Sequence, residues 1–174
     1  NEALRQIKAG DLSLADADDK LKADKEVVLA AVKQDVFALE YADESLKADR
    51  EVVLAAIQNE YGQAIEHAGK NLKKDKEIVL AAVEQDGYAI EFADKSLKKD
   101  RDVVLAAVQK DGSALEHANK SLKKDRKIVL AAVKNSEYAF EHADPSLRKD
   151  NKFVISIINE DNFSSLKEHL GNGL

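Results

Sequence analysis

Residues 100–124 read DRDVVLAAVQKDGSALEHANKSLKK, and nearly the same phrase opens at Asp24, Asp49, Asp75 and Asp125. Successive copies are 25 residues apart with a single step of 26, and a weaker copy begins at Asp150. Self-similarity at a fixed period of this size is the signature of a repeat array, in which each unit buries its apolar face against its neighbours. The phrase therefore predicts a stack of repeats rather than a closed globule.

The apolar run VVLAAV at 103–108 is predicted to be a buried helix, which we call helix A. A central Ala-Ala pair favours a helix over a strand, and the preceding Asp-Arg-Asp supplies an N-cap and an acidic first turn. Because this helix is apolar on most of its circumference, we expect neighbours to cover it on more than one side. Truncating Leu105 to alanine should then cost about 2–5 kcal/mol.

Gly112 and its equivalents Gly62 and Gly87 follow helix A, where a helix commonly ends in a left-handed residue. We therefore expect positive φ at these glycines. Val36 and Glu137 occupy the same position in their repeats, and a β-branched residue rarely takes positive φ, so the turn at Val36 should differ.

A second, short helix is predicted at 88–93, where Ala89, Ile90 and Ala93 form one apolar stripe. We call this segment helix B. Pro145 indicates that it ends by Asp144 in the last full repeat, and the register carries this boundary to Asp43, Gly69, Asp94 and Asn119. One further helical turn, SLKK or SLRK, should follow and bury its leucine. These leucines are Leu46, Leu72, Leu97, Leu122 and Leu147.

The fold class predicted is an all-α solenoid of helical-hairpin repeats in one domain spanning 1–174, with the handedness left open. Residues 24–149 hold five full repeats, and degenerate capping repeats occupy 1–23 and 150–174. In the first cap, polar Arg5 and Gln6 replace the Ala-Ala pair. In the last, a bulkier helix A is expected from Phe153 to Ile158 and a shifted helix B at Phe163, Leu166 and Leu170.

Composition narrows the possible roles. The net charge of −6 disfavours general affinity for nucleic acid or anionic membranes, and no apolar run approaches the roughly 20 residues of a membrane span. We therefore expect a soluble protein without a transmembrane segment. The chain has no cysteine, which leaves both reducing and oxidising compartments open. It shows no signal peptide and begins at Asn1, as a processed or trimmed piece of a longer protein would.

The phrase DREVVLAAV, followed by GxALExA and SLKxD, resembles the repeat of a bacterial family catalogued as domain of unknown function four-one-one-six. The resemblance covers about residues 24–150 in five tandem copies, with weaker copies at both ends. It implies an α-helical unit found in tandem and a role in binding partners. It brings no reaction, cofactor or catalytic residue. Val36, Glu137 and the insertion near Tyr61 depart from the pattern.

Two adjacent rows on helix B are candidates for a partner-binding stripe. The first, which we call the glutamate row, contains Glu40, Glu66, Glu91, Glu116 and Glu141, and the second contains Tyr41, His67, Phe92, His117 and His142. At about 10 Å spacing, neighbouring carboxylates repel by only about 0.4 kcal/mol in water, so a solvated face explains the glutamate row equally well. Half-buried packing explains the aromatic row. No metal site is predicted, because adjacent helical residues diverge and zinc ligands must converge to about 2 Å from one ion.

The third candidate is a basic ridge at the turns between repeats. It consists of Lys73, Lys74, Lys76, Lys98, Lys99, Arg101, Lys123, Lys124, Arg126, Arg148 and Lys149. Such a ridge can attract an acidic protein or phosphates. An aspartate interrupts every cluster, and no aromatic residue interleaves with the lysines to stack on bases, so nucleic acid is disfavoured.

We expect no catalytic residues, cofactor or enzymatic activity, because nearly every polar residue is one copy of a row and no catalytic motif is present. The predicted function is a protein-interaction scaffold whose partner is another protein. Two alternatives stay open: an anion or nucleic-acid binder that uses the basic ridge, and a passive spacer. The partner, the face used, the oligomeric state and the cellular location are not set by the sequence.

Overall fold

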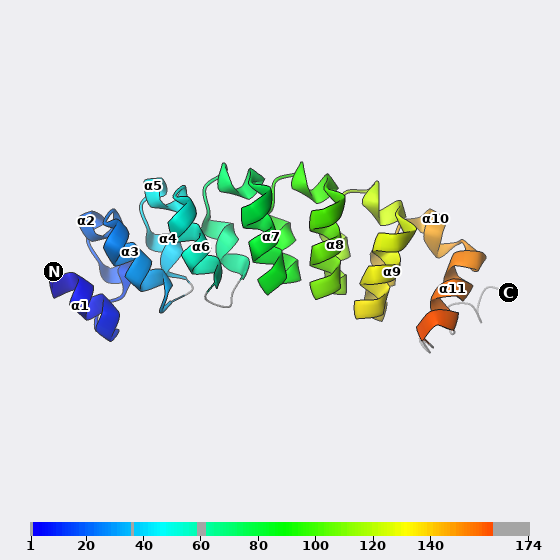
Figure 1. Cartoon of the computed structure of the whole chain (residues 1–174), viewed down its shortest axis with the longest axis horizontal. Helices are drawn as coiled ribbons and strands as arrows, with labels where there is room; N and C mark the ends of the chain where they lie inside the picture. The colour runs from blue at the N-terminus through cyan, green and yellow to red at the C-terminus, as the bar shows by residue number, and fades with distance from the viewer. Residues whose placement is uncertain (1, 36, 59–61, 162–174) are drawn as a thin grey trace.

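The computed structural model describes residues 2–35, 37–58 and 62–161, and within these ranges every regular element is helical. The elements stack in single file from α1 to α11, so the N-terminal helix and the last described helix lie at opposite ends of an elongated array (Figure 1). The all-α repeat solenoid predicted from the sequence is confirmed.

Each repeat contributes three short elements. The A helices are α3 (Lys25–Val32), α6 (Arg50–Gln58), α7 (Lys76–Gln85), α8 (Arg101–Lys110) and α9 (Arg126–Asn135). The helix-B segments are α4 (Ala38–Tyr41), η2 (Gly62–His67), η4 (Gly87–Phe92), η6 (Gly112–His117) and η8 (Glu137–His142). The third elements are α5 (Glu44–Lys47), η3 (Leu72–Lys74), η5 (Leu97–Lys99), η7 (Leu122–Lys124) and α10 (Pro145–Arg148).

Most helix-B segments are 3₁₀ helices, a tighter form than the prediction specified. In η4 the segment is confined between two extended residues, Asp86 and Ala93, which leaves six residues for a helix. Short pieces of this kind commonly adopt i→i+3 hydrogen bonds. The predicted stripe is nevertheless buried: Ala89, Ile90 and Ala93 have at most 6% of their surface exposed.

From α6 onward, the aspartate that opens each A helix links two repeats through its two carboxylate oxygens. Asp125 Oδ1 accepts hydrogen bonds from the amides of Lys127 and Ile128 at 2.9 and 3.2 Å, which caps α9. Asp125 Oδ2 accepts a hydrogen bond from Arg101 Nε of the preceding repeat at 2.9 Å. The same interaction joins successive repeats in the pairs Lys25–Asp49, Arg50–Asp75, Lys76–Asp100, Arg101–Asp125 and Arg126–Asp150.

A ladder of backbone hydrogen bonds also joins the repeats, at the edge that carries the third elements. The residue after helix B donates its amide to the carbonyl of a lysine one repeat earlier, for example Asn119 to Lys98 at 2.9 Å. Equivalent bonds join Asp43 to Lys22, Gly69 to Lys47, Asp94 to Lys73 and Asp144 to Lys123.

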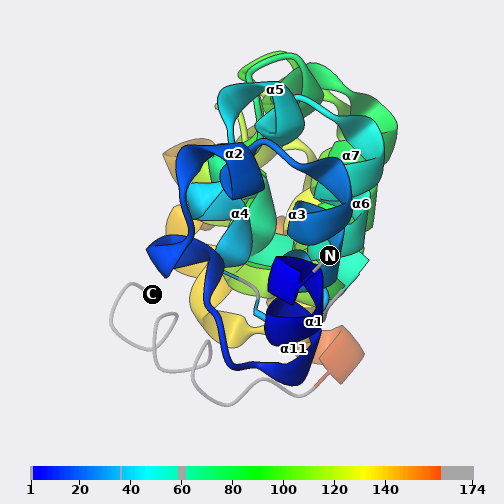
Figure 2. The ribbon, with the colours of Figure 1, turned by 90° about the vertical axis from the view of Figure 1, so that its left-hand side faces the viewer.

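Viewed end-on, α3, α6 and α7 form one layer, α4 lies in the other, and α5 lies along the turn edge (Figure 2). As predicted, Asp144 caps α10, with Pro145 at its start.

The core consists of valines and alanines from the A helices and of apolar residues from helix B. Val103, Val104, Ala107 and Val108 of α8 are completely buried. As predicted, helix A is covered on more than one side, by the flanking A helices and by helix B. Leu105 and Ala106 are only half-buried, because within the described residues no third layer covers that side of the helix. The cost predicted for truncating Leu105 is correspondingly too high, because it assumed full burial.

The repeat glycines serve close packing and not positive φ, which corrects the sequence prediction. Among the described residues the only positive-φ glycine is Gly10, at +79°. Gly62, Gly87 and Gly112 begin helix-B segments, and a Cβ on Gly87 would lie 2.4 Å from the carbonyl oxygen of Ala107 in the next repeat. The glycine thus lets one repeat approach the C-terminal end of the following A helix. Val36 lies outside the described residues, so the turn predicted to differ there is not described.

The N-terminal cap repeats the three-element plan with α1 (Glu2–Ala9), η1 (Leu14–Asp16) and α2 (Asp19–Lys22). At the other end α11 (Asn151–Asp161) buries Phe153, Val154 and Ile157. The shifted helix B expected at Phe163, Leu166 and Leu170 lies outside the described residues. None of the described helices is both long and apolar enough to cross a membrane.

We predict that Gly87→Ala lowers the free energy of unfolding by about 1–3 kcal/mol, since the added methyl group collides with backbone that cannot rotate away. Glu137→Ala is the matched control, because that side chain already occupies the same repeat position, and it should change stability by less than about 0.5 kcal/mol. Urea unfolding monitored by circular dichroism measures both. Equal losses in the two variants would contradict this role of the glycine.

We also predict that Asp125→Asn destabilises the protein at pH 7 and does so less in acid. The Arg101 guanidinium holds the pKa of Asp125 below its usual range, as Lys25 does for the pKa of Asp49. A depressed folded-state pKa contributes stability that is present above about pH 4 and is lost as the pH falls further. Asparagine preserves the cap but not the charge, so the loss should be about 0.2–1 kcal/mol at pH 7.

Urea unfolding midpoints at pH 7 and at about pH 2.5 test this, with the exposed Asp11→Asn variant as the control. The difference between Asp125→Asn and the wild type should shrink at the lower pH, because Asp125 of the wild type takes up a proton and loses its attraction to Arg101. An equal difference at the two pH values would show that the loss does not arise from the charge of Asp125.

Candidate functional site

The predicted partner stripe lies on the helix-B layer, opposite the A helices. The five side chains of the glutamate row are all exposed. Among the described residues none of these carboxylates forms an ion pair, although acids elsewhere in the array are paired. The carboxylates of the glutamate row are therefore not directly paired, although Lys98 and Lys123 attract those of Glu91 and Glu116.

The neighbouring row is mostly half-buried, as the packing interpretation expected. His67, Phe92, His117 and His142 have intermediate exposure, and Tyr41 is 40% exposed. His117 shows the contact that fills this row: the Tyr88 ring of the preceding repeat meets it edge-on, with ring centroids 4.6 Å apart. The Tyr88 hydroxyl also donates to Glu116 Oε2 at 3.3 Å. This tyrosine thus touches both rows of the next repeat.

The position of Tyr88 reveals a third row that the sequence analysis missed. Phe37 and Tyr138 occupy the same repeat position and are 62% and 79% exposed, whereas Gln63 and Ser113 fill it in the other repeats. The variation between aromatic and small polar residues hid this row, although the aromatic members follow directly after the glycine position. We call the glutamate row together with Phe37, Tyr41, Tyr88 and Tyr138 the acid–aromatic face.

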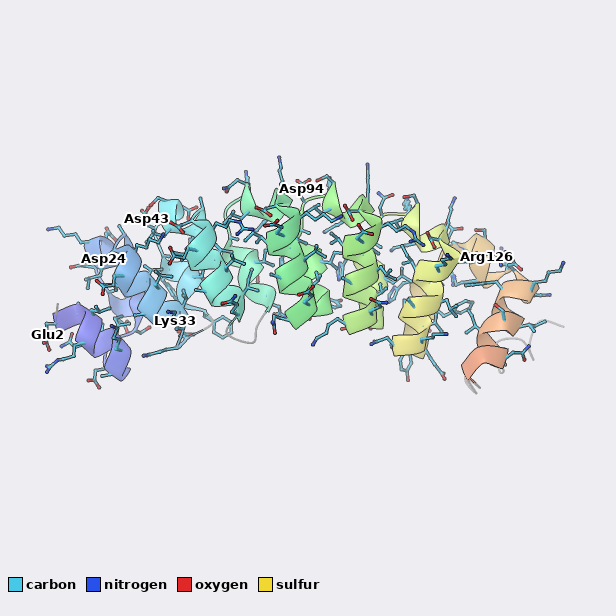
Figure 3. The ribbon with its side chains drawn as sticks, viewed as in Figure 1. Glu2, Asp24, Lys33, Asp43, Asp94 and Arg126 are labelled. Atoms are coloured by element: carbon cyan, nitrogen blue, oxygen red, sulfur yellow. The ribbon has the colours of Figure 1, made fainter. Side chains whose placement is uncertain are left out.

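The basic ridge lies on the turn edge, and most of its cations serve the fold. The ammonium groups of Lys73, Lys98 and Lys123 donate to the helix-B carbonyls of Glu66, Glu91 and Glu116 at 2.6–2.7 Å. Burial lowers the pKa of Lys98 and of Lys123. Figure 3 labels Asp43 and Asp94 along this edge, together with Arg126 at the start of α9.

The remaining ridge residues divide into two groups. Lys76, Arg101 and Arg126 form the ion pairs between repeats described above, and Lys124 lies 3.9 Å from Asp144. Lys74, Lys99, Arg148 and Lys149 form no ion pair with another described residue. Seven of the eleven ridge cations are thus engaged by the fold, four of them in ion pairs and three with backbone carbonyls.

His117 is the most perturbed member of the aromatic row. Its Nε2 atom is buried and has no hydrogen-bond partner among the described residues. Burial lowers its pKa against the opposing attraction of Glu91 and Glu116, and Lys98 and Lys123 add to the decrease. In the residues that the structure describes, no group of three or more histidine, cysteine or acidic side chains has the arrangement needed to hold a metal ion.

We predict that acidification destabilises the protein through His117 and that His117→Phe removes part of this effect. Because the folded-state pKa lies below the unfolded value, the unfolded chain binds more protons, and stability falls as the pH drops below about 6.5. Phenylalanine occupies the same position at Phe92, so the variant should fold. Urea midpoints at pH 7.5 and 5.5 measure the change, with His67→Phe as the matched control. An identical pH dependence in His117→Phe and the wild type would contradict the assignment.

A family model described as Domain of unknown function (DUF4116) matches the chain in five overlapping segments, 7–47, 24–73, 49–98, 100–148 and 125–168. No curated protein matches the chain. No solved structure matches it either.

Proposed function

Because this chain belongs to the family described as Domain of unknown function (DUF4116), a description that names no activity, we propose its function from its surface. We propose that it is a non-catalytic protein-binding module that holds a cationic segment of another protein along the acid–aromatic face. Three features of this face support the proposal: its exposed aromatic side chains, its unpaired carboxylates and its spacing.

The exposed aromatic residues are the observation that carries the proposal. Of the four large hydrophobic residues exposed in the described part of the chain, three are Phe37, Tyr41 and Tyr138 of this face. Folding gains little from the rings of Phe37 and Tyr138, because they remain largely in water, and Tyr41 is 40% exposed. Aromatic side chains of this kind are the usual anchors of protein interfaces, where they desolvate a large area at a low cost in side-chain entropy.

The negative charge of the acid–aromatic face favours a positively charged partner segment. No carboxylate of the glutamate row forms an ion pair with another described residue, and aromatic rings attract ammonium and guanidinium groups through their negative faces. A lysine- or arginine-rich segment can pair with the carboxylates and also contact the aromatic rings. An acidic segment would be repelled along the whole row.

The distance between successive repeats determines the conformation that we expect for the bound segment. The A helices of successive repeats pack directly on one another, and packed helices lie about 8–10 Å apart. A polyproline II segment advances about 3.1 Å per residue with three residues per turn, so every third side chain points to the same side and three residues span one repeat. We therefore expect the bound segment to be extended and to carry a lysine or arginine at every third position.

We predict that a fluorescein-labelled peptide with arginine at every third position binds the protein, and that Glu91→Gln/Glu116→Gln weakens binding about tenfold. Two exposed charge pairs contribute about 0.2–1 kcal/mol each, and about 1.4 kcal/mol corresponds to a factor of ten. Tyr138→Ala should weaken binding further. Fluorescence anisotropy at 50 and 200 mM salt measures the affinities.

Glu26→Gln/Glu84→Gln is the matched control, because it makes the same charge change on exposed side chains of the A helices. It should leave the affinity unchanged. A peptide of identical composition with clustered arginines tests the spacing and should bind more weakly. Equal losses in the two double variants would contradict the proposed face. Binding of heparin or DNA in place of the peptide would favour the basic ridge, and no binding of any probe would favour a spacer.

A further inference from the structure

A second unpartnered surface lies on the opposite layer, where each A helix presents a leucine and an alanine to solvent. This leucine–alanine stripe consists of Leu29, Ala30, Leu54, Ala55, Leu80, Ala81, Leu105, Ala106, Leu130 and Ala131, all of them half-buried. Leu4 of α1 and Ile155 of α11, which is 48% exposed, continue it into the caps. The fold covers the neighbouring valines completely but leaves this row in contact with water.

At the N-terminal end the stripe is hollowed into two adjoining grooves. The first, about 310 Å³, is lined by Leu29, Ala30, Lys8, Glu26, Lys33 and Gln34 of α1 and α3. The second, about 510 Å³, has a floor of Leu29, Leu54 and Ala55 between α3 and α6. The alanines lower the floor relative to the leucines. Such a surface accepts the side-chain ridge of another helix, because packed helices interlock ridges with grooves.

The charged residues around the grooves indicate which charges such a helix carries beside its apolar face. Lys8 lies in the last turn of α1, and Lys33 directly follows the last residue of α3. Neither lysine forms an ion pair with another described residue. Arg50 and Glu51 also line the second groove but are already paired, with Glu77 and Lys25 respectively. Lys33 projects from the end of α3 that lies away from the turn edge (Figure 3). This rim therefore carries two cations without counterions.

The charged residues at the two ends of α3 indicate the direction in which the bound helix lies. Glu26, at the opposite rim, forms no ion pair with another described residue. A helix lying antiparallel to α3 brings its N-terminal turn to Lys8 and Lys33 and its C-terminal turn to Glu26. Acidic residues favour the first turn of a helix and basic residues the last, because they offset the helix dipole. The charges that stabilise the bound helix on its own thus match the two rims.

We propose that the groove formed by α1, α3 and α6 binds one amphipathic helix of a partner protein, antiparallel to α3, with its acidic first turn at Lys8 and Lys33. This site is independent of the acid–aromatic face, since it lies in the other layer and takes a helix of opposite terminal charge rather than an extended cationic segment. A partner that carries both elements would contact the two layers together.

We test this with two fluorescein-labelled helical peptides that share a leucine face and basic residues in the last turn. One carries glutamate at three first-turn positions and the other carries glutamine there. The glutamate peptide should bind about tenfold more tightly, and Lys8→Gln/Lys33→Gln should abolish the difference, whereas Lys127→Gln/Lys152→Gln at the other end of the array should preserve it. Leu54→Gln should remove the binding of both peptides, and circular dichroism of this variant checks that it still folds.

Three results would overturn the proposal. The first is equal affinity of the wild type for the two peptides, and the second is unchanged binding to Leu54→Gln. The third is a concentration-dependent dimer in sedimentation velocity that Leu54→Gln dissociates, because the groove would then be covered by a second copy of this chain. Glu91→Gln/Glu116→Gln should leave peptide binding in the groove unchanged, which separates failure here from failure of the acid–aromatic face.

Discussion

The structure depends on one aspartate per repeat whose two carboxylate oxygens act in two different repeats. One oxygen caps its own A helix, and the other receives the cation of the preceding repeat, as Asp125 does between the amides of α9 and Arg101. Helices this short are marginal when isolated. Because the cap and the contact between repeats share a single side chain, formation of each A helix is coupled to its stacking on the one before it. The stability of the array therefore arises from neighbour contacts and not from any single repeat.

The same constraint explains which surface charges remain for other uses. The cations after each capping aspartate and the lysines that bond to helix-B carbonyls are engaged in holding the stack. The glutamate row and the leucine–alanine stripe contribute little to that task, and both extend along the whole array. Two opposite layers thus present chemically different surfaces, one acidic and aromatic and the other apolar with charged rims. An elongated stack provides such surfaces without a closed pocket.

Much of the fold was predictable because the repeat multiplies each local signal. The aspartate caps, the boundary at Asp144 and the burial of Leu46, Leu72, Leu97 and Leu147 follow from residue types at fixed positions, whereas Leu122, also predicted to be buried, is half-buried. The role of Gly87 and its equivalents was not predictable, since a glycine after a helix satisfies either positive φ or close approach, and only the neighbouring repeat decides which. The 3₁₀ form of helix B and the half-exposure of Leu105 likewise depend on how adjacent repeats are spaced.

For the candidate site, the sequence identified the two rows of helix B but not the Tyr88 position that connects them.

The coupling between neighbouring repeats underlies all of these features, and amide hydrogen exchange on the Val104→Ala variant tests this coupling most directly. Val104 is fully buried in α8, so its truncation loosens that helix. We predict that protection falls in α8 and, to a smaller degree, in α7 and α9, and that it is unchanged in α3. A loss of protection confined to α8 would contradict the account.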